Sequence, residues 1–226
     1  MPEEKVVSHA KVGIIGGGIM GVSLLYHLAK EEWKDLVLVE KGELTSGSTW
    51  HAAGQCPQMM GSYNLAKIHK ESNNLYKKLE KETEQPTGFH ECGSLRIAYK
   101  KEDLDWFKYV KGILDNIGAP SEIISTNEIR KVHPFIKLDG ILGAFHTPDD
   151  GHTDPTSTTN AMAKGARNYG AKIYRKNRVT DIKHLPSGEW KLITEKGDII
   201  CEHVVNAAGS YGPEVGAMVG LKNIPS

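Results

Sequence analysis

Three glycines near the amino terminus have the spacing of a dinucleotide-binding turn. Gly16, Gly18 and Gly21 fit the pattern G-x-G-x-x-G. In this pattern the first glycine permits a tight turn, the second lets the backbone approach a pyrophosphate, and the third lets a helix pack closely against a strand. The pattern alone is weak evidence, because a glycine-rich turn in an ordinary α/β domain would look the same.

The segments around these glycines supply the elements that a dinucleotide site needs. An apolar run, Val12–Ile15, precedes the turn, Ile19–Lys30 carries apolar residues at helical spacing, and a second apolar run, Leu36–Val39, ends in Glu40. Glu40 lies 19 residues after Gly21, where an acid accepts a hydrogen bond from the ribose 2′-OH. The amino terminus of the helix would face the phosphates. The sequence therefore predicts a strand–turn–helix–strand unit that binds a dinucleotide.

The segment after Glu40 is a loop rich in Gly, Ser and Thr. It must return toward the ligand, because the second strand is expected to end beside the first. Within it, His51 stands among small residues, between Trp50 and Gly54. A lone histidine is usually a structural side chain, but its place in this loop leaves a functional role open.

Composition excludes several classes of function. The 226 residues include 28 Lys and Arg and 28 Asp and Glu, so the net charge is zero and nothing attracts nucleic acid or an anionic membrane. No apolar run approaches the roughly 20 residues of a membrane span, and Met1–Ala10 resembles neither a secretory signal nor a transit peptide. Cys56, Cys92 and Cys201 are widely spaced, which favours free thiols in a reducing compartment.

The remainder of the chain alternates helices and strands, which predicts an α/β fold. We expect a nucleotide-binding domain from residues 1–60 and 140–226, and an insertion of helices and strands from residues 61–139. The expected helices are Asn64–Glu84, Glu102–Ile117, Ser125–Val132 and Thr156–Tyr169, and the expected strands are Gly93–Tyr99, Gly140–His146, Lys172–Tyr174, Val179–Lys183, Trp190–Thr194 and Ile199–Ala208.

An acidic turn, Pro148–Pro155, contains Asp149, Asp150 and His152 and invites a metal assignment. Turn chemistry and helix capping explain these residues without an ion, because Asp154 stands directly before Pro155 as a helix N-cap would. We therefore expect no metal site.

Five segments resemble the flavin-dependent amine oxidoreductases of the D-amino-acid-oxidase and glycine-oxidase type, and within that family the branch that contains dimethylglycine and sarcosine dehydrogenases. They are the glycine turn with its extra Gly17, EKGELTSGSTWHAAG (Glu40–Gly54), GFHECGSLRIA (Gly88–Ala98), DDGHTDP (Asp149–Pro155) and VVNAAG (Val204–Gly209). The resemblance covers nearly the whole chain from Lys11, and STWHAAG is its most specific part. It implies a Rossmann-like FAD-binding domain of the glutathione-reductase type with an inserted α+β substrate-side region, truncated at the carboxyl terminus.

The resemblance also implies which residues hold FAD. In this branch the histidine of STWHAAG is bonded to the 8α-methyl carbon of the flavin, and His51 matches it. The implied cofactor-binding residues are Gly16, Gly18, Ile19, Met20, Gly21, Glu40, Lys41, Gly47, Ser48, Thr49, Trp50, His51, Ala52, Ala53, Gly54, Gln55, Val179, Ala208 and Gly209.

The activity implied by the resemblance is oxidation of the C–N bond of a secondary or tertiary amine, as in N-demethylation of dimethylglycine or sarcosine. Electron-transferring flavoprotein or oxygen would accept the electrons. Family members continue beyond the VVNAAG strand, and some bind tetrahydrofolate there, so we expect this chain to be the amino-terminal part of a longer enzyme, inactive alone. The expected location is the cytoplasm in a bacterium or the mitochondrial matrix in a eukaryote.

Two other functions remain open. The glycine pattern does not separate FAD from NAD, so an NAD-dependent dehydrogenase is the nearest enzymatic alternative. A non-catalytic flavoprotein such as the regulatory subunit of pyruvate dehydrogenase phosphatase is the other. The presence of His51 argues against this second alternative, because a regulatory scaffold needs no covalent flavin.

Overall fold

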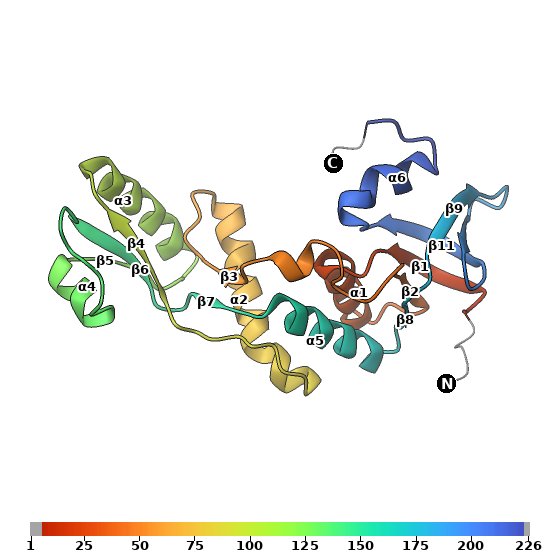
Figure 1. The fold of residues 1–226 in the computed structure, drawn as a ribbon, viewed down its shortest axis with the longest axis horizontal. Helices are drawn as coiled ribbons and strands as arrows, with labels where there is room; N and C mark the ends of the chain where they lie inside the picture. Colours follow the sequence, from red (N-terminus) through yellow and green to blue (C-terminus); the bar gives the residue numbers. More distant parts are fainter. Residues whose placement is uncertain (1–5, 224–226) are drawn as a thin grey trace. The chain divides into compact units, whose positions relative to one another are not determined.

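The computed structural model describes residues 6–223, and the contacts divide the chain into two compact units. The first unit comprises residues 1–53, 79–87 and 155–226, and the second comprises residues 54–78 and 88–154. The domain boundaries expected from the sequence, at residues 60 and 140, stay a prediction. Figure 1 shows the course of the chain through the elements of each unit.

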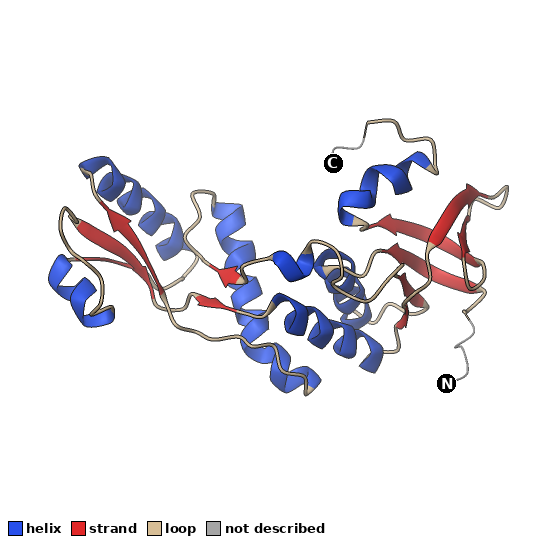
Figure 2. Ribbon diagram, viewed as in Figure 1, coloured by secondary structure: helices blue, strands red, loops and turns tan. Residues whose placement is uncertain are grey.

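A six-stranded sheet forms the centre of the first unit (Figure 2). The strand order is β8 (Lys172–Tyr174), β2 (Leu36–Val39), β1 (His9–Ile15), β11 (Ile199–Asn206), β10 (Trp190–Thr194) and β9 (Val179–His184). The first four strands are parallel, and β10 and β9 add an antiparallel pair. This arrangement confirms the predicted α/β class with a parallel sheet.

Two helices pack together beside this sheet. Helix α1 (Ile19–Lys30) connects β1 to β2, and α5 (Pro155–Asn168) precedes β8. Gly165 allows the two helices to approach closely, because a Cβ atom there would lie 2.8 Å from the ring of Tyr26. Tyr26 is fully buried. One small residue in α5 thus makes room for one large residue in α1.

Three adjacent parallel strands end at the same edge of the sheet. Gly16 follows β1, Glu40 follows β2, and Ala207 follows β11. β1 lies between β2 and β11. The strand that follows β1 in sequence, β2, pairs on one side of it, and β11 pairs on the other side. Ligands of open α/β sheets bind in the crevice at such a switch point.

The second unit contains two small sheets and three helices. Strand β3 (Gln55–Cys56) pairs with β7 (Gly151–His152), and β6 (Gly143–Thr147) lies between β4 (Ser94–Ala98) and β5 (Glu122–Ile124). The helices are α2 (Tyr63–Thr83), of which the last five residues belong to the first unit, α3 (Lys101–Asn116) and α4 (Thr126–Val132). Phe107 of α3 and Phe145 of β6 are buried in its core.

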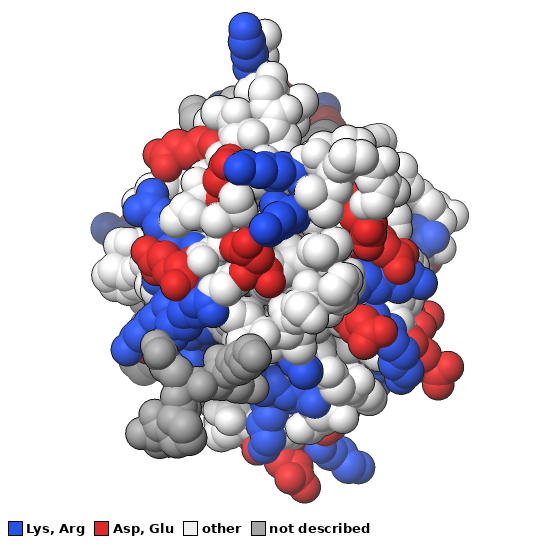
Figure 3. Space-filling model, turned by 90° about the vertical axis from the view of Figure 1, so that its right-hand side faces the viewer, with Lys and Arg blue, Asp and Glu red and all other residues white. Residues whose placement is uncertain are grey.

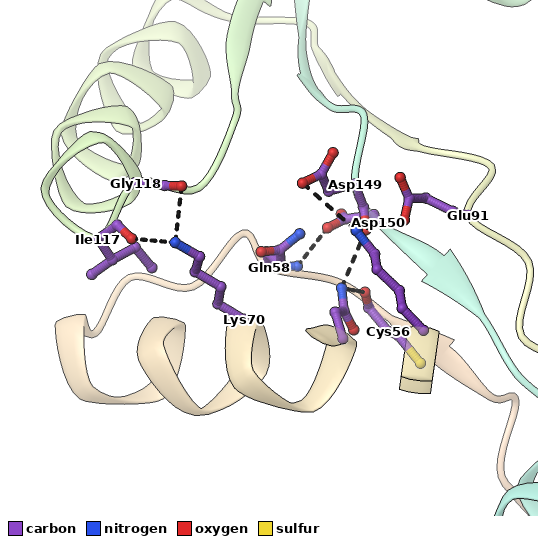
Figure 4. A network of polar contacts seen from close by, with 10 residues as sticks. Cys56, Gln58, Lys70, Glu91, Ile117, Gly118, Asp149 and Asp150 are labelled. Atoms are coloured by element: carbon purple, nitrogen blue, oxygen red, sulfur yellow. Dashed lines mark hydrogen bonds and ion pairs between the residues drawn. The ribbon is translucent and has the colours of Figure 1, made fainter. Parts of the chain in front are cut away.

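Asp150 joins β4 and β6 to the segment after β3, and Figure 4 shows its bond to Gln58 in that segment. Its carboxylate accepts hydrogen bonds from the Gln58 N–H at 2.8 Å, the Ser94 hydroxyl at 2.6 Å and the Thr147 hydroxyl at 2.5 Å. The side chain is 1% exposed. The acidic turn thus carries a buried structural carboxylate, which the turn composition did not reveal.

The helices and strands predicted from periodicity are all present, with ends that differ by up to three residues. The short elements β3, β5, β7 and α6 (Gly212–Ala217) were not predicted. Helix α2 is apolar on part of its exposed surface, because Leu65 and Ile68 are 50% and 61% exposed. The proposed capping of α5 by Asp154 stays a prediction.

The surface shows no large region of one charge on the face drawn in Figure 3, where basic and acidic side chains are interspersed. This agrees with the equal numbers of acidic and basic residues. Within residues 6–223, no helix combines the length and the apolar character that crossing a membrane requires.

Candidate cofactor-binding site

A cavity of about 590 Å³ opens at the carboxyl ends of β1, β2 and β11, within the first unit. This volume lies in the range of small-molecule and cofactor sites. The lining residues are Ile15, Gly16, Gly17, Gly18, Ile19, Met20, Val39, Glu40, Lys41, Ser46, Gly47, Ser48, Thr49, Ala52, Arg178, Val179, Ala207, Ala208, Gly209, Ser210, Tyr211, Glu214, Val215 and Met218.

Two glycines of the turn are required by the backbone itself. Gly16 has φ +117°, and a Cβ atom on it would lie 2.3 Å from the Ala207 carbonyl oxygen. A Cβ atom on Gly21 would lie 2.1 Å from the Gly16 carbonyl oxygen. These are the tight turn and the close helix–strand packing that the sequence pattern predicts. A side chain on Gly16 would force the turn away from the segment after β11, and a side chain on Gly21 would force α1 away from the turn.

Gly18 is different, because a Cβ atom there would meet no backbone atom within 4 Å. Its φ is −78°, which any residue adopts, and a Cβ atom there would have one neighbour within 4 Å, the Thr49 hydroxyl oxygen at 3.1 Å. Gly18 also lines the cavity. The absence of a side chain therefore leaves space for a ligand rather than for the protein.

The first turn of α1 presents backbone N–H groups to the cavity. The first N–H groups of a helix have no partner within the helix. The Ile19 N–H donates to the Thr49 hydroxyl at 3.0 Å, which leaves the amides of Gly18 and Met20, both at the cavity wall. Together with the helix dipole, these amides favour an anion such as a pyrophosphate.

Glu40, at the end of β2, is 8% exposed and holds two loops by its carboxylate. One oxygen accepts the Gly17 N–H at 2.6 Å, and the other accepts the Gly42 N–H at 2.7 Å. Because each carboxylate oxygen has about two acceptor positions, capacity remains for a ribose hydroxyl. Glu40 thus shapes the turn, and its contact with ribose stays a prediction.

One wall of the cavity is apolar, and a lysine side chain lies at its rim. Val179, Val215 and Met218 pack in the same apolar cluster behind the cavity, a surface that suits a flat aromatic base. At its rim the Lys41 ammonium lies 3.0 Å from the centroid of the Tyr211 ring. This cation–π contact joins the end of β2 to the segment after β11.

His51 lies at the end of a short 3₁₀ helix, η1 (Thr49–His51), in the first unit. Its ring is exposed and stacks on Trp50, with the ring centroids 3.7 Å apart and the planes inclined by 33°. His51 is not among the lining residues, although Thr49 and Ala52 on either side of it are. The structure thus brings the segment around His51 to the cavity.

The predicted cofactor residues fall into four groups. Thirteen of them line the cavity, and Gly21 supports the turn from behind. Trp50, His51 and Ala53 are exposed in the adjoining segment, and Gly54 and Gln55 belong to the second unit. The thirteen lining residues are Gly16, Gly18, Ile19, Met20, Glu40, Lys41, Gly47, Ser48, Thr49, Ala52, Val179, Ala208 and Gly209.

Sequence reasoning missed the wall formed after β11. Tyr211, Glu214, Val215 and Met218 come from α6 and its neighbours, and Arg178 precedes β9. A signal for α6 was present, because Pro213 follows Gly212 at the start of the helix and prolines favour that position. A helix of six residues is too short to show a helical spacing of apolar residues, so the sequence did not predict it.

Comparisons with known proteins point to a family of flavin-dependent enzymes. The family model described as FAD dependent oxidoreductase matches residues 11–226. Mitochondrial dimethylglycine dehydrogenase of Rattus norvegicus is 46% identical over 220 residues, which are 97% of this chain and 25% of that protein. The mitochondrial pyruvate dehydrogenase phosphatase regulatory subunit of Mus musculus is 36% identical over 209 residues, 92% of this chain and 24% of that protein.

Among solved structures, L-proline dehydrogenase from P. horikoshii superposes with a TM-score of 0.87 at 29% identity, covering 97% of this chain and 58% of that one. The chain spans about a quarter of the length of the two curated relatives. Because the family model covers residues 11–226, the chain belongs to the family of FAD-dependent oxidoreductases.

Proposed function

We propose that this chain is the FAD-binding part of an enzyme that oxidises the C–N bond of a secondary or tertiary amine. The observation that carries the proposal is the cavity at the ends of β1, β2 and β11, where Gly18 and the first turn of α1 suit a pyrophosphate. The resemblance to dimethylglycine dehydrogenase favours an N-methyl group of dimethylglycine or sarcosine as the reacting group.

The residues of the cavity would suit the parts of FAD. The amides of Gly18 and Met20 would hold the pyrophosphate, Glu40 the ribose, and the wall around Val179 the adenine. Bound FAD would supply hydride acceptance from the N-methyl carbon. The resulting iminium ion reacts with water to give formaldehyde and the demethylated amine. The chain's own part is to orient the cofactor and to keep its phosphates desolvated.

We further propose that His51 bonds covalently to the flavin. The bond would join an imidazole nitrogen of His51 to the 8α-methyl carbon, and each of the two atoms would give up a proton. Dioxygen would be the two-electron oxidant and would become hydrogen peroxide. The support is the STWHAAG motif together with the position of His51 between the lining residues Thr49 and Ala52.

Several finer features belong to the same proposal. Electron-transferring flavoprotein would take the electrons, and tetrahydrofolate would bind outside this chain and capture the formaldehyde. The two curated relatives described above are mitochondrial, which favours the mitochondrial matrix if the source is a eukaryote. In a bacterium the location would be the cytoplasm.

Two alternatives compete with this function. An NAD-dependent dehydrogenase would use the same phosphate turn, but would have no use for His51 beside the cavity. A regulatory flavoprotein is favoured by the 36% identity to the phosphatase regulatory subunit, which is lower than the 46% identity to dimethylglycine dehydrogenase.

Anaerobic reduction by candidate amines tests the proposal. The intact protein, as its host produces it, would be mixed with dimethylglycine, sarcosine or trimethylglycine. We expect dimethylglycine or sarcosine to bleach the flavin absorbance and to release formaldehyde. Trimethylglycine is the matched control, because its quaternary nitrogen has no lone pair with which to form an iminium. Bleaching by none of the amines would refute the proposed activity and favour the regulatory alternative.

A further inference from the structure

The loop after β2 is fastened to the glycine turn by hydrogen bonds on both sides of Gly17. The Gly17 N–H donates to Glu40 at 2.6 Å, and the Gly17 carbonyl accepts the Thr45 N–H at 3.0 Å. Packing is equally close, because a Cβ atom on Gly17 would lie 2.7 Å from Leu44. Gly17, the extra glycine of the turn, therefore has no side chain because the loop crosses the turn closely at this position.

A third bond joins the far end of the same loop to α1. The Ile19 N–H donates to the Thr49 hydroxyl at 3.0 Å, and Thr49 is 9% exposed. This bond stands in for an N-cap side chain, since the N-cap residue of α1 is Gly18 and has none. Thr49 lies two positions before His51, so it is the tether nearest to that ring.

The short helix that carries His51 lies beside α5, but few hydrogen bonds hold it. Within η1 the His51 N–H donates to the Ser48 carbonyl at 3.1 Å, and the Ala52 N–H donates to the Thr49 carbonyl at 3.2 Å. A single 3₁₀ turn is not stable alone. Trp50, on which the His51 ring stacks, is itself 57% exposed. The buried Thr49 side chain is thus the anchor of this segment.

We propose that Thr49 is a positioning residue, whose hydroxyl holds η1 against the start of α1 and so places the His51 ring for bond formation with the flavin. The inference rests on the proposed covalent flavin and deepens it. Reactions between held groups are sensitive to displacements of about 1 Å. Loss of one tether should therefore slow bond formation more than it weakens cofactor binding, because the phosphate turn stays intact.

The first experiment measures the tether without any flavin. Hydrogen exchange of the His51 and Ala52 amides would be compared in the apoprotein, in Thr49→Val and in Thr49→Ser. Valine keeps the shape of threonine and loses the hydroxyl, whereas serine keeps the hydroxyl. We expect exchange roughly tenfold faster in Thr49→Val and close to wild type in Thr49→Ser. Equal exchange in all three proteins would overturn the tether.

The second experiment separates positioning from cofactor contact, which matters because Thr49 also lines the cavity. The rate of appearance of acid-stable flavin at saturating FAD would be measured in wild type and both Thr49 variants. The Kd for FAD would be measured in His51→Ala, with and without Thr49→Val. We expect Thr49→Val to slow bond formation roughly tenfold, with serine restoring the rate and the Kd changing less than about threefold.

The possible outcomes separate this inference from the proposed function. A wild-type bonding rate in Thr49→Val would overturn the positioning role, and so would a Kd that rises as much as the rate falls. A wild-type protein that forms no covalent flavin would refute the covalent part of the proposed function and, with it, the role of Thr49 in placing His51. The exchange measurement would then still decide whether the tether exists.

Discussion

The glycines of the phosphate turn are not equivalent. Gly16 and Gly21 are needed by the backbone, because a side chain on either would meet a carbonyl oxygen at less than 2.5 Å. Gly18 faces the cavity and has an ordinary φ of −78°. A sequence pattern gives the three positions equal weight, whereas the structure assigns two of them to folding and one to the ligand.

Substitution at these positions should separate folding from binding. We expect Gly18→Val to remain folded, with a smaller loss of stability than Gly21→Ala, and to lose FAD binding, because its side chain occupies the space of the pyrophosphate and its Cβ atom meets only the Thr49 hydroxyl, at 3.1 Å. Gly21→Ala should instead lower the stability of the apoprotein by several kcal/mol through the clash with Gly16. Thermal unfolding and flavin content would be measured for both. A folded Gly18→Val protein with full flavin content would place the cofactor elsewhere.

One carboxylate of α2 forms hydrogen bonds with α1 and with the residue that follows α5. Glu82, in the last turn of α2, accepts from the hydroxyls of Tyr26 at 2.5 Å and Tyr169 at 2.9 Å, and from the Lys30 ammonium at 2.8 Å. Burial raises the pKa of Glu82, but these hydrogen bonds outweigh burial and leave the pKa below its ordinary value. Burial and the bond to Glu82 raise the pKa of Tyr26 to about 12.

The sign of the resulting pH dependence follows from the lowered pKa of Glu82. The ionised Glu82 side chain stabilises the folded state fully above the pKa that this carboxyl group has in the unfolded chain, near 4.5. This stabilisation is lost as the pH falls through the lower pKa that Glu82 has in the folded state. We expect Glu82→Gln to cost about 1–2 kcal/mol at pH 7 and progressively less below pH 4.5. Glu71→Gln, at an exposed position of the same helix, is the control for urea unfolding across this range. A cost of Glu82→Gln that does not change with pH would assign its effect to packing instead.

Asp150 should matter more than its neighbour Asp149 for the second unit. Asp150→Asn turns an amide toward groups that donate to the carboxylate, which should cost roughly 1–3 kcal/mol. Asp149 pairs with Lys77 at 3.8 Å and is partly exposed, so Asp149→Asn should cost less than about 0.5 kcal/mol. Hydrogen exchange in β4 and β6 reports on this unit directly. Equal protection in the two variants would contradict the structural role of Asp150.

The elements that the sequence predicted well are those whose own residues determine them. β1, β2 and α1 have long apolar runs or helical periods, and the dinucleotide turn between them has a fixed spacing. β5, by contrast, has three residues and is defined by pairing with β6. Helix α6, in the cavity wall, has only six residues. Such short elements depend on contacts distant in sequence, so periodicity alone does not reveal them.

The geometry inside the site was predicted only in outline. The sequence located Glu40 and the loop with His51, but not the bonds of Glu40 to Gly17 and Gly42, because those depend on how the loop folds back over the turn. The cation–π contact of Lys41 with Tyr211 joins residues 170 positions apart. No spacing rule connects such residues, and only the sheet order brings them together.

At the scale of the molecule, the first unit holds the whole candidate cofactor cavity. It assembles from residues before position 54 and after position 177, because β11 returns to pair with β1. In sequence, the second unit lies between these parts. Among the residues that the structure describes, it contributes none to the cavity. The curated relatives are about four times longer than the segment that matches them, so substrate binding is a property to be measured on the intact protein.

The fate of the flavin on denaturation tests the proposed function most directly. The intact protein, as its host produces it, would be precipitated with acid, digested, and its peptides analysed by mass spectrometry. We predict a yellow precipitate and a flavin adduct on the peptide that contains His51, and free flavin in the supernatant of His51→Ala. Unmodified FAD or NAD released from the wild-type protein, with an unmodified His51 peptide, would contradict the covalent assignment.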